Sequence, residues 1–125
     1  MTADLAPANP SARPVARFNP SRMLEVEEQA GSIALVYELI DLFTTDVRQR
    51  LAELTSAVRG AGRRERERIA HSIKGSCANL GAEHMAELAA AIERCPEAKA
   101  QELLRALLDE FRQLCAELAE RYPKT

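Results

Sequence analysis

Residues 70–82, AHSIKGSCANLGA, contain the pattern that decides the fold of this chain. On a helical wheel the apolar side chains of this region share one face: Ile69, Ile73, Cys77 and Leu80. His71 falls on roughly the opposite side, and Gly81 is a stop signal that allows only a tight turn. The stretch therefore predicts an amphipathic helix that exposes a histidine and packs against an antiparallel helix after the turn.

Working outward, apolar residues recur at three- and four-residue steps in five segments bounded by glycine or proline. These segments cover about 21–30, 32–59, 63–80, 82–94 and 96–122, with Ser21 and Ser32 as expected N-caps of the first two. There is no alternating pattern of the kind that strands require. The sequence predicts an all-α, antiparallel, up-and-down four-helix bundle with a short N-terminal cap helix. An extended coiled coil fits less well because glycines and Pro96 interrupt the apolar stripes.

The first twenty residues differ from the rest in composition. Four of the six prolines of the chain lie here, at positions 7, 10, 14 and 20. Such a segment cannot sustain a helix or build a core. We therefore expect residues 1–20 to form a disordered, proline-rich arm and residues 21–125 to form the bundle domain.

Charge and cysteine content exclude several classes of protein. Seventeen basic and 19 acidic residues give a net charge of -2, which argues against a general binder of nucleic acid or anionic membranes. No secretion signal and no apolar run near ~20 residues is present, so we expect a cytoplasmic protein. The three cysteines lack a C-x-x-C pair and indicate neither a zinc site nor a disulfide framework; buried apolar positions in a reducing cytosol explain them.

The chemistry of the chain centres on His71. Its neighbours on the exposed face of the predicted helix are Arg64, Glu67, Arg68, Lys74, Gly75 and Ala78. A glycine inside an exposed helix costs ~1 kcal/mol relative to alanine, so Gly75 needs another reason, and close approach of a second molecule is one. Neutral imidazole is a good nucleophile near pH 7, and Lys74 can offset the charge of a transferred phosphoryl group.

This H-x-x-K-G spacing resembles a known family, the histidine-containing phosphotransfer (HPt) domains of bacterial multistep phosphorelays. The family pattern is met by His71, Ile73, Lys74, Gly75, Ser76, Cys77, Leu80 and Gly81, and the resemblance extends by helix pattern over about residues 21–122. It implies that His71 accepts a phosphoryl group from a receiver-domain aspartate and passes it to another receiver, assisted by Lys74, while Gly75 leaves space. The implied partners are response-regulator receiver domains and hybrid histidine kinases. A monomeric carrier is expected, with no cofactor and no ATP-dependent kinase activity of its own.

Helix geometry predicts that Glu93 lies close to His71. If the helices on either side of residues 81–82 are antiparallel, His71 and Glu93 are equidistant from the turn and lie at the same level. Family members often place Gln or Glu there to accept a hydrogen bond from Nδ1–H, which leaves Nε2 free to attack. A solvated surface carboxylate is the alternative, and the sequence leaves both open.

A docking surface around His71 is predicted from the residues on its face: Arg64, Arg68, Lys74, Gly75 and Ala78. The arginines of the run RRERER, residues 63–68, either steer an acidic partner or simply form a solvated helix surface. Met23, Leu24 and Val26 either add an apolar part to the docking surface or cap the core.

Other functions are less well supported. His84 lacks Lys and Gly at the following positions and is interpreted as an ordinary surface histidine; its separation from His71 also disfavours a metal site. A phosphoacceptor module of a chemotaxis-type histidine kinase would need an ATP-binding domain, for which 125 residues leave no room. The alternative from a different class is a helical adaptor that binds a receiver domain without phosphotransfer.

Overall fold

The computed structural model describes residues 15–124, apart from the side chain of Ala61. Within this part of the chain there are helices and loops but no strands. The helices are α1 (Ser21–Ala30), α2 (Ala34–Ser56), the single π-helical turn η2 (Ala57–Ala61), α3 (Arg63–Leu80), α4 (Glu83–Arg94) and α5 (Glu97–Arg121). The predicted all-α bundle is confirmed.

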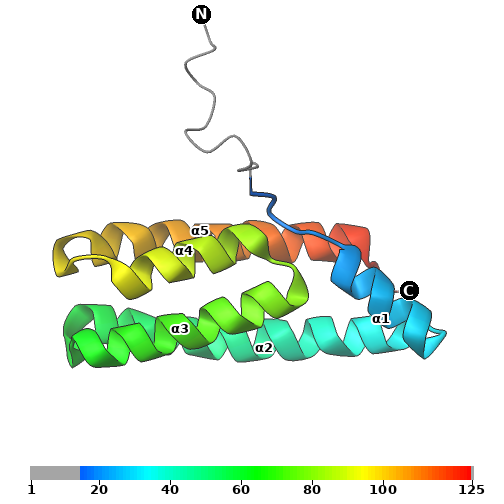
Figure 1. Ribbon diagram of the computed structural model, residues 1–125, viewed down its shortest axis with the longest axis horizontal. Coiled ribbons are helices and arrows are strands. Elements are labelled where there is room, and N and C mark those ends of the chain that lie inside the picture. Colours follow the sequence, from blue (N-terminus) through cyan, green and yellow to red (C-terminus); the bar gives the residue numbers. More distant parts are fainter. Residues whose placement is uncertain (1–14, 125) are drawn as a thin grey trace, which may run out of the picture.

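The four longer helices form an up-and-down bundle in which successive helices are antiparallel (Figure 1). A single core runs between them, with Leu54, Ile73, Met85 and Leu107 among the side chains that are fully buried. The predicted apolar face of α3 is observed, since all four of its expected residues are at most 4% exposed. The antiparallel order follows from the short connections, which allow each helix to pack only beside its neighbour in sequence.

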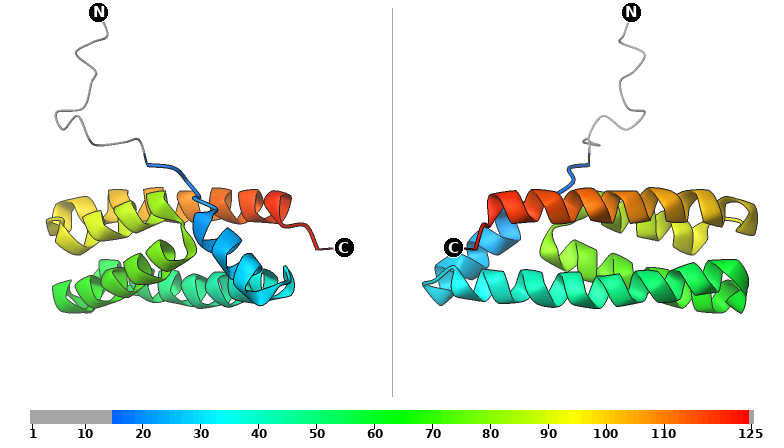
Figure 2. Two further views of the ribbon diagram at one scale, coloured as in Figure 1. Left: turned by 45° about the vertical axis from the view of Figure 1, so that its right-hand side comes forward. Right: turned by 180° about the vertical axis from the view of Figure 1, so that it is seen from behind.

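One end of the bundle is closed by the N-terminal part of the chain. α3 and α4 have 18 and 12 residues, against 23 and 25 for α2 and α5, so the two longer helices extend past the α3–α4 turn. α1 crosses this end, where the views from three directions place it beside the turn (Figures 1 and 2). Met23 of α1 is 3% exposed and Phe18 is 5% exposed. The short cap helix therefore completes the core.

Residues 16–20 form a strap that joins α1 to the rest of the bundle. The backbone N–H of Asn19 donates to the carbonyl of Gly81 at 2.8 Å, and that of His84 donates to the carbonyl of Ala16 at 3.0 Å. Phe18 packs edge-on against the ring of Tyr122. The expectation of a loose arm is wrong for residues 15–20, because Phe18 supplies apolar surface that covers the bundle end; residues 1–14 lie outside the described residues.

The helix starts differ slightly from the expected caps. Ser21 is already helical, and the side chain of Asn19 accepts the hydrogen bond of its N–H at 3.0 Å, so Ser21 as N-cap is wrong. Ser32 does serve the start of α2, since its hydroxyl accepts from the N–H of Ala34 at 3.0 Å. Each contact satisfies one of the unpaired donors of a first helical turn.

Cys77 and Cys95 are buried and Cys115 is half-buried, in line with their interpretation as small apolar residues. Burial raises the pKa of Cys77 to about 12, so its thiol stays protonated near neutral pH. Among the described residues, no helix combines the length and the apolar character that a membrane crossing would require.

Candidate functional site

α3 carries His71 near its middle, on the face that points away from the core. The side chain of His71 is 64% exposed, whereas Ile69 and Ile73 on the opposite face are at most 1% exposed. This contrast follows from the 100° step between helical residues, which places His71, two residues after Ile69, on the opposite side of the helix from the apolar stripe. The histidine is thus presented to solvent by a helix whose other side is fixed in the core.

Glu93 reaches His71 from the last turn of α4. Gly81, at a φ of 104°, makes the tight turn that sets α3 and α4 antiparallel. Glu93 Oε2 lies 3.0 Å from His71 Nδ1, so the predicted proximity of the two side chains is observed. With the ring neutral, Nδ1–H donates to the carboxylate, and Nε2 makes no hydrogen bond to the described residues. This contact selects the tautomer that leaves the Nε2 lone pair free.

Lys74 completes a three-residue cluster. Its Nζ lies 3.3 Å from Glu93 Oε1, so one carboxylate holds His71 on one oxygen and Lys74 on the other. Partial burial alone would raise the pKa of Glu93, but the hydrogen bonds from Lys74 and His71 outweigh it and hold that pKa below its ordinary value. Glu93 is therefore an anion at neutral pH, and Lys74 offsets its charge.

Gly75 lies one turn beyond His71 on the same exposed face. A Cβ built at Gly75 would meet no atom within 4 Å of the described structure. Its backbone is ordinary α-helix, because the positive φ angles of the described chain belong to Gly31, Gly62 and Gly81. Neither packing nor backbone conformation requires a glycine here, which agrees with the idea that an incoming surface does.

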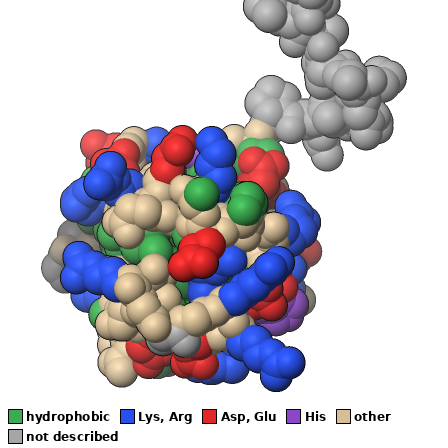
Figure 3. Space-filling model, turned by 90° about the vertical axis from the view of Figure 1, so that its left-hand side faces the viewer, with side chains coloured by type: hydrophobic (Ala, Val, Ile, Leu, Met, Phe, Trp, Pro, Cys, Tyr) green, Lys and Arg blue, Asp and Glu red, His purple; other side chains and the backbone are tan. Residues whose placement is uncertain are grey.

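The remaining predicted docking residues are exposed but differ in their pairing. Ala78 and Arg64 are exposed, and Arg64 makes no ion pair within residues 15–124. Arg68 lies 2.6 Å from Glu65, and its hydrogen bond holds the pKa of Glu65 below the ordinary value. At the bundle end that carries the start of α3, Lys and Arg side chains are interspersed with Asp and Glu (Figure 3). This end of the bundle is therefore mixed in charge rather than a continuous basic patch.

An apolar groove lies beside the His71 face, between α1, α2 and α3. It is lined by Met23, Leu39, Leu42, Phe43, Asp46, Ser76, Asn79 and Leu80, with a volume of about 320 Å³. Leu42 is 66% exposed at its rim, the most exposed large apolar side chain described. Of the three α1 residues considered from the sequence, Met23 is buried, Val26 is half-buried and Leu24 is 55% exposed.

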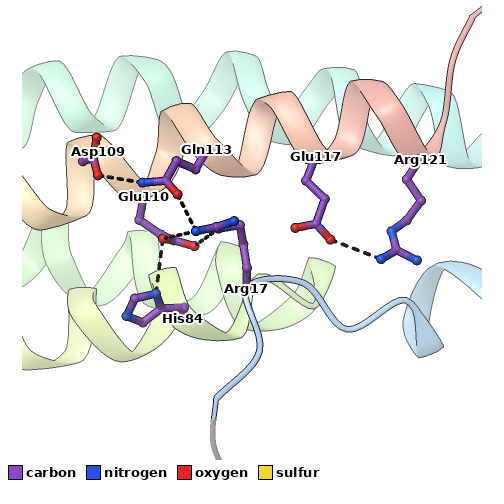
Figure 4. A network of polar contacts seen from close by, with 7 residues as sticks. All are labelled: Arg17, His84, Asp109, Glu110, Gln113, Glu117 and Arg121. Carbon is purple, nitrogen blue, oxygen red and sulfur yellow. Dashed lines mark hydrogen bonds and ion pairs between the residues drawn. The ribbon is translucent and has the colours of Figure 1, made fainter.

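His84 belongs to a network that the sequence did not reveal (Figure 4). Glu110 of α5, with a side chain only 5% exposed, accepts from Arg17 Nε at 2.7 Å and lies 3.2 Å from His84 Nδ1. His84 is 43% exposed, and beyond its interpretation as an ordinary surface histidine it contacts this buried carboxylate of α5. A signal was present in α5, where Glu110 interrupts the apolar stripe between Leu107 and Phe111. The described residues contain no cluster of three or more side chains suited to hold a metal ion.

Comparison with known proteins agrees with this arrangement. The family model of the Hpt domain, a phosphoryl carrier of phosphorelays, matches residues 38–121, which include His71, Lys74, Gly75 and Glu93. No curated protein and no solved structure gives a significant match. The family match covers more than half of the chain and the observed bundle is consistent with it. The chain belongs to the Hpt domain family.

Proposed function

We propose that His71 is the phosphoacceptor of this chain, and that it takes a phosphoryl group from the aspartyl phosphate of one receiver domain and gives it to the aspartate of another. One observation carries the proposal: His71 is 64% exposed, its Nδ1 is held 3.0 Å from Glu93, and its Nε2 has no hydrogen-bond partner among the described residues. Gly75, one turn along the same helix, adds no side chain beside it.

The proposed step involves only the imidazole of His71 and the aspartyl phosphate of the receiver. The Nε2 lone pair of neutral His71 attacks phosphorus, the N–P bond forms, and the P–O bond to the receiver aspartate breaks, leaving its carboxylate. The ring retains the proton on Nδ1 and becomes positively charged. Glu93, 3.0 Å from Nδ1, stabilises this charge, and transfer to the next receiver reverses the same bond changes.

Lys74 has two parts in this proposal. In the free protein it pairs with Glu93 at 3.3 Å and offsets a negative charge that would repel the incoming phosphoryl group. Its side chain is 37% exposed, so the ammonium group retains access to solvent and to the phosphoryl oxygens. A flexible point charge of this kind suits a group whose charge moves during transfer.

Docking of the receiver would use the small exposed residues Gly75 and Ala78 together with Arg64, Arg68 and Lys74. The apolar groove adjoins this face through Ser76 and Asn79 of α3, and Leu42 stands at its rim. A stable protein interface of about 800 Å² per partner is wide enough to include both His71 and the groove. The charged residues then contribute to the rate of encounter more than to affinity.

Gly75→Ala is expected to raise stability and lower function. Alanine removes the helix penalty of glycine, about 1 kcal/mol, and its Cβ meets nothing in the chain, so the midpoint of urea unfolding should increase. Phosphotransfer from a receiver should slow, and Gly75→Gln should slow it further because the longer side chain obstructs the partner. If Gly75→Gln transferred phosphate as fast as wild type, the close-approach role would be rejected.

Glu93→Ala is expected to slow transfer without abolishing it. Without the carboxylate the ring loses the acceptor that favours Nδ1–H, and we expect a rate loss of about ten- to hundredfold in single-turnover assays. Glu93→Gln keeps an acceptor and should retain more activity. Unchanged kinetics in Glu93→Ala would show that the carboxylate is only a solvated surface group.

The function itself is tested by mixing the purified chain with receiver domains of the same genome that have been charged with acetyl phosphate. We expect a phosphoryl group that is labile in acid, stable in base and located on His71 by mass spectrometry, and that a second receiver then removes. If receivers form complexes with the chain but never transfer phosphate to it, the chain is an adaptor and the proposal fails.

A further inference from the structure

Arg66 is a buried cation five residues before His71 on α3. Its residue is 3% exposed, although the surrounding run RRERER is otherwise at or near the surface. Within residues 15–124 no carboxylate lies within ion-pair distance of its guanidinium, and both of its hydrogen bonds go to Cys95. Removing a charge from water is costly unless other groups compensate, so the partner of Arg66 needs explanation.

The compensating group is the C-terminal end of α4. Arg66 Nη2 donates to the carbonyl oxygen of Cys95 at 3.1 Å, and Nη1 lies 3.1 Å from Cys95 Sγ. The unpaired carbonyls of a last helical turn carry partial negative charge, which a cation stabilises. The C-terminal end of α4 therefore takes the place of the carboxylate that a buried guanidinium usually needs as its partner.

α4 needs such a contact because its own chain does not close it. α1, α3 and α5 each end with a backbone N–H that donates back into the helix. Cys95 is instead extended, with φ -78° and ψ 156°, and Pro96 after it has no N–H. Only the Cys95 thiol turns back, to the carbonyl of Ile92 at 3.5 Å. Arg66 thus caps α4 from outside, across the α3–α4 interface.

The same turn of α4 carries Glu93, two residues before Cys95. Two links therefore join the last turn of α4 to α3: one from Arg66 to Cys95, the other from Glu93 to His71 and Lys74. The first link is buried, whereas the second is partly open to solvent, since the side chain of Glu93 is 26% and that of His71 64% exposed. A buried, doubly hydrogen-bonded contact is the more rigid of the two.

We propose that Arg66 is a positioning residue for phosphotransfer: by capping α4 on Cys95, it holds the Glu93 carboxylate at the distance that keeps the proton of His71 on Nδ1. Without this cap the last turn of α4 loosens and Glu93 samples positions away from the ring. The tautomer with its proton on Nδ1 and a free lone pair on Nε2 is then less populated. The effect on rate rests on the proposed function, but the effect on the ring tautomer does not.

The first test measures the tautomer in the unphosphorylated protein. The chain has only two histidines, so ring ¹⁵N chemical shifts can report His71 and His84 separately at a pH where both rings are neutral. Arg66→Met removes the charge and keeps an unbranched side chain; it should lower the Nδ1–H fraction of His71 toward that of Glu93→Ala. The ring of His84, which contacts Glu110, should not change and serves as the internal control. An unchanged His71 tautomer in Arg66→Met would overturn the proposal.

The second test asks whether Arg66 acts through Glu93. We expect Arg66→Met to slow phosphotransfer about three- to tenfold in the wild-type background and to have no further effect on Glu93→Ala, because residues that act through one another are not additive. Equal slowing in both backgrounds would indicate a general structural role and reject the proposal. Arg66→Lys keeps the charge but cannot make both contacts, so it should be intermediate in both measurements. If Arg66→Met does not fold, Arg66→Lys decides by the same comparison.

Discussion

Replacing His71 by glutamine should abolish phosphoryl acceptance, with a loss of about a thousandfold or more in the rate of transfer from a charged receiver. Glutamine preserves a polar side chain of similar length on the exposed face of α3, so the bundle should fold as before. Its amide nitrogen has no available lone pair, and no other nucleophile stands at this position. The measurement is the amount of base-stable phosphate on the chain after incubation with labelled receivers.

His84→Gln is the matched control for this loss, because His84 is the second of the two histidines and lies on α4. It should accept phosphate at the wild-type rate. Its expected defect is in stability instead, since it removes a partner of the buried Glu110. Phosphate on His71→Gln equal to that on wild type, or loss of acceptance in His84→Gln alone, would contradict the assignment of the phosphoacceptor.

Gly81→Ala should destabilise the fold by about 3 kcal/mol, measured as the free energy of unfolding in urea. Two effects add at this position. The backbone has a φ of 104°, which residues with a Cβ rarely adopt, and the new Cβ would clash with the backbone carbonyl oxygen of Asn19. That oxygen belongs to the strap, so relief of the clash would require the strap to move off the α3–α4 turn.

Gly31→Ala separates these two effects. Gly31 also has a positive φ, 70°, but a Cβ built there meets nothing within 4 Å. It should therefore cost only the backbone term, about 1 kcal/mol. If the two variants lost equal stability, the contact between the strap and the turn would contribute nothing, and the structural role given to residues 16–20 would be wrong.

Most of the fold could be predicted because the relevant signals are local. Glycine and proline mark the helix ends, and the apolar periodicity of α3 identified both its buried face and the exposure of His71. Glu93 could be placed at the site from the sequence alone. The turn at Gly81 is tight, so residues at equal distances before and after it lie at the same level of the two antiparallel helices. The charge run before His71 was less informative about structure, because its pattern does not distinguish solvated arginines from a buried one.

The features that the sequence missed depend on contacts between distant segments. The strap contacts Gly81 and His84 across more than sixty residues, and nothing in a proline-rich stretch indicates which surface Phe18 will cover. Arg66 and Glu110 are charged residues at buried positions, compensated by Cys95 in one case and by Arg17 and His84 in the other. Periodicity places a residue on a face but does not identify its partner.

Because α2 and α5 extend past the α3–α4 turn, the core has an end that other residues must cover, and this affects where the domain can be cut. The family match begins at residue 38, yet the end of the core is covered by Phe18 and Met23. A fragment cut at the start of the match would leave this apolar end open to water or to another fragment. For this chain, the unit recognised by sequence similarity is therefore shorter than the unit that closes the core.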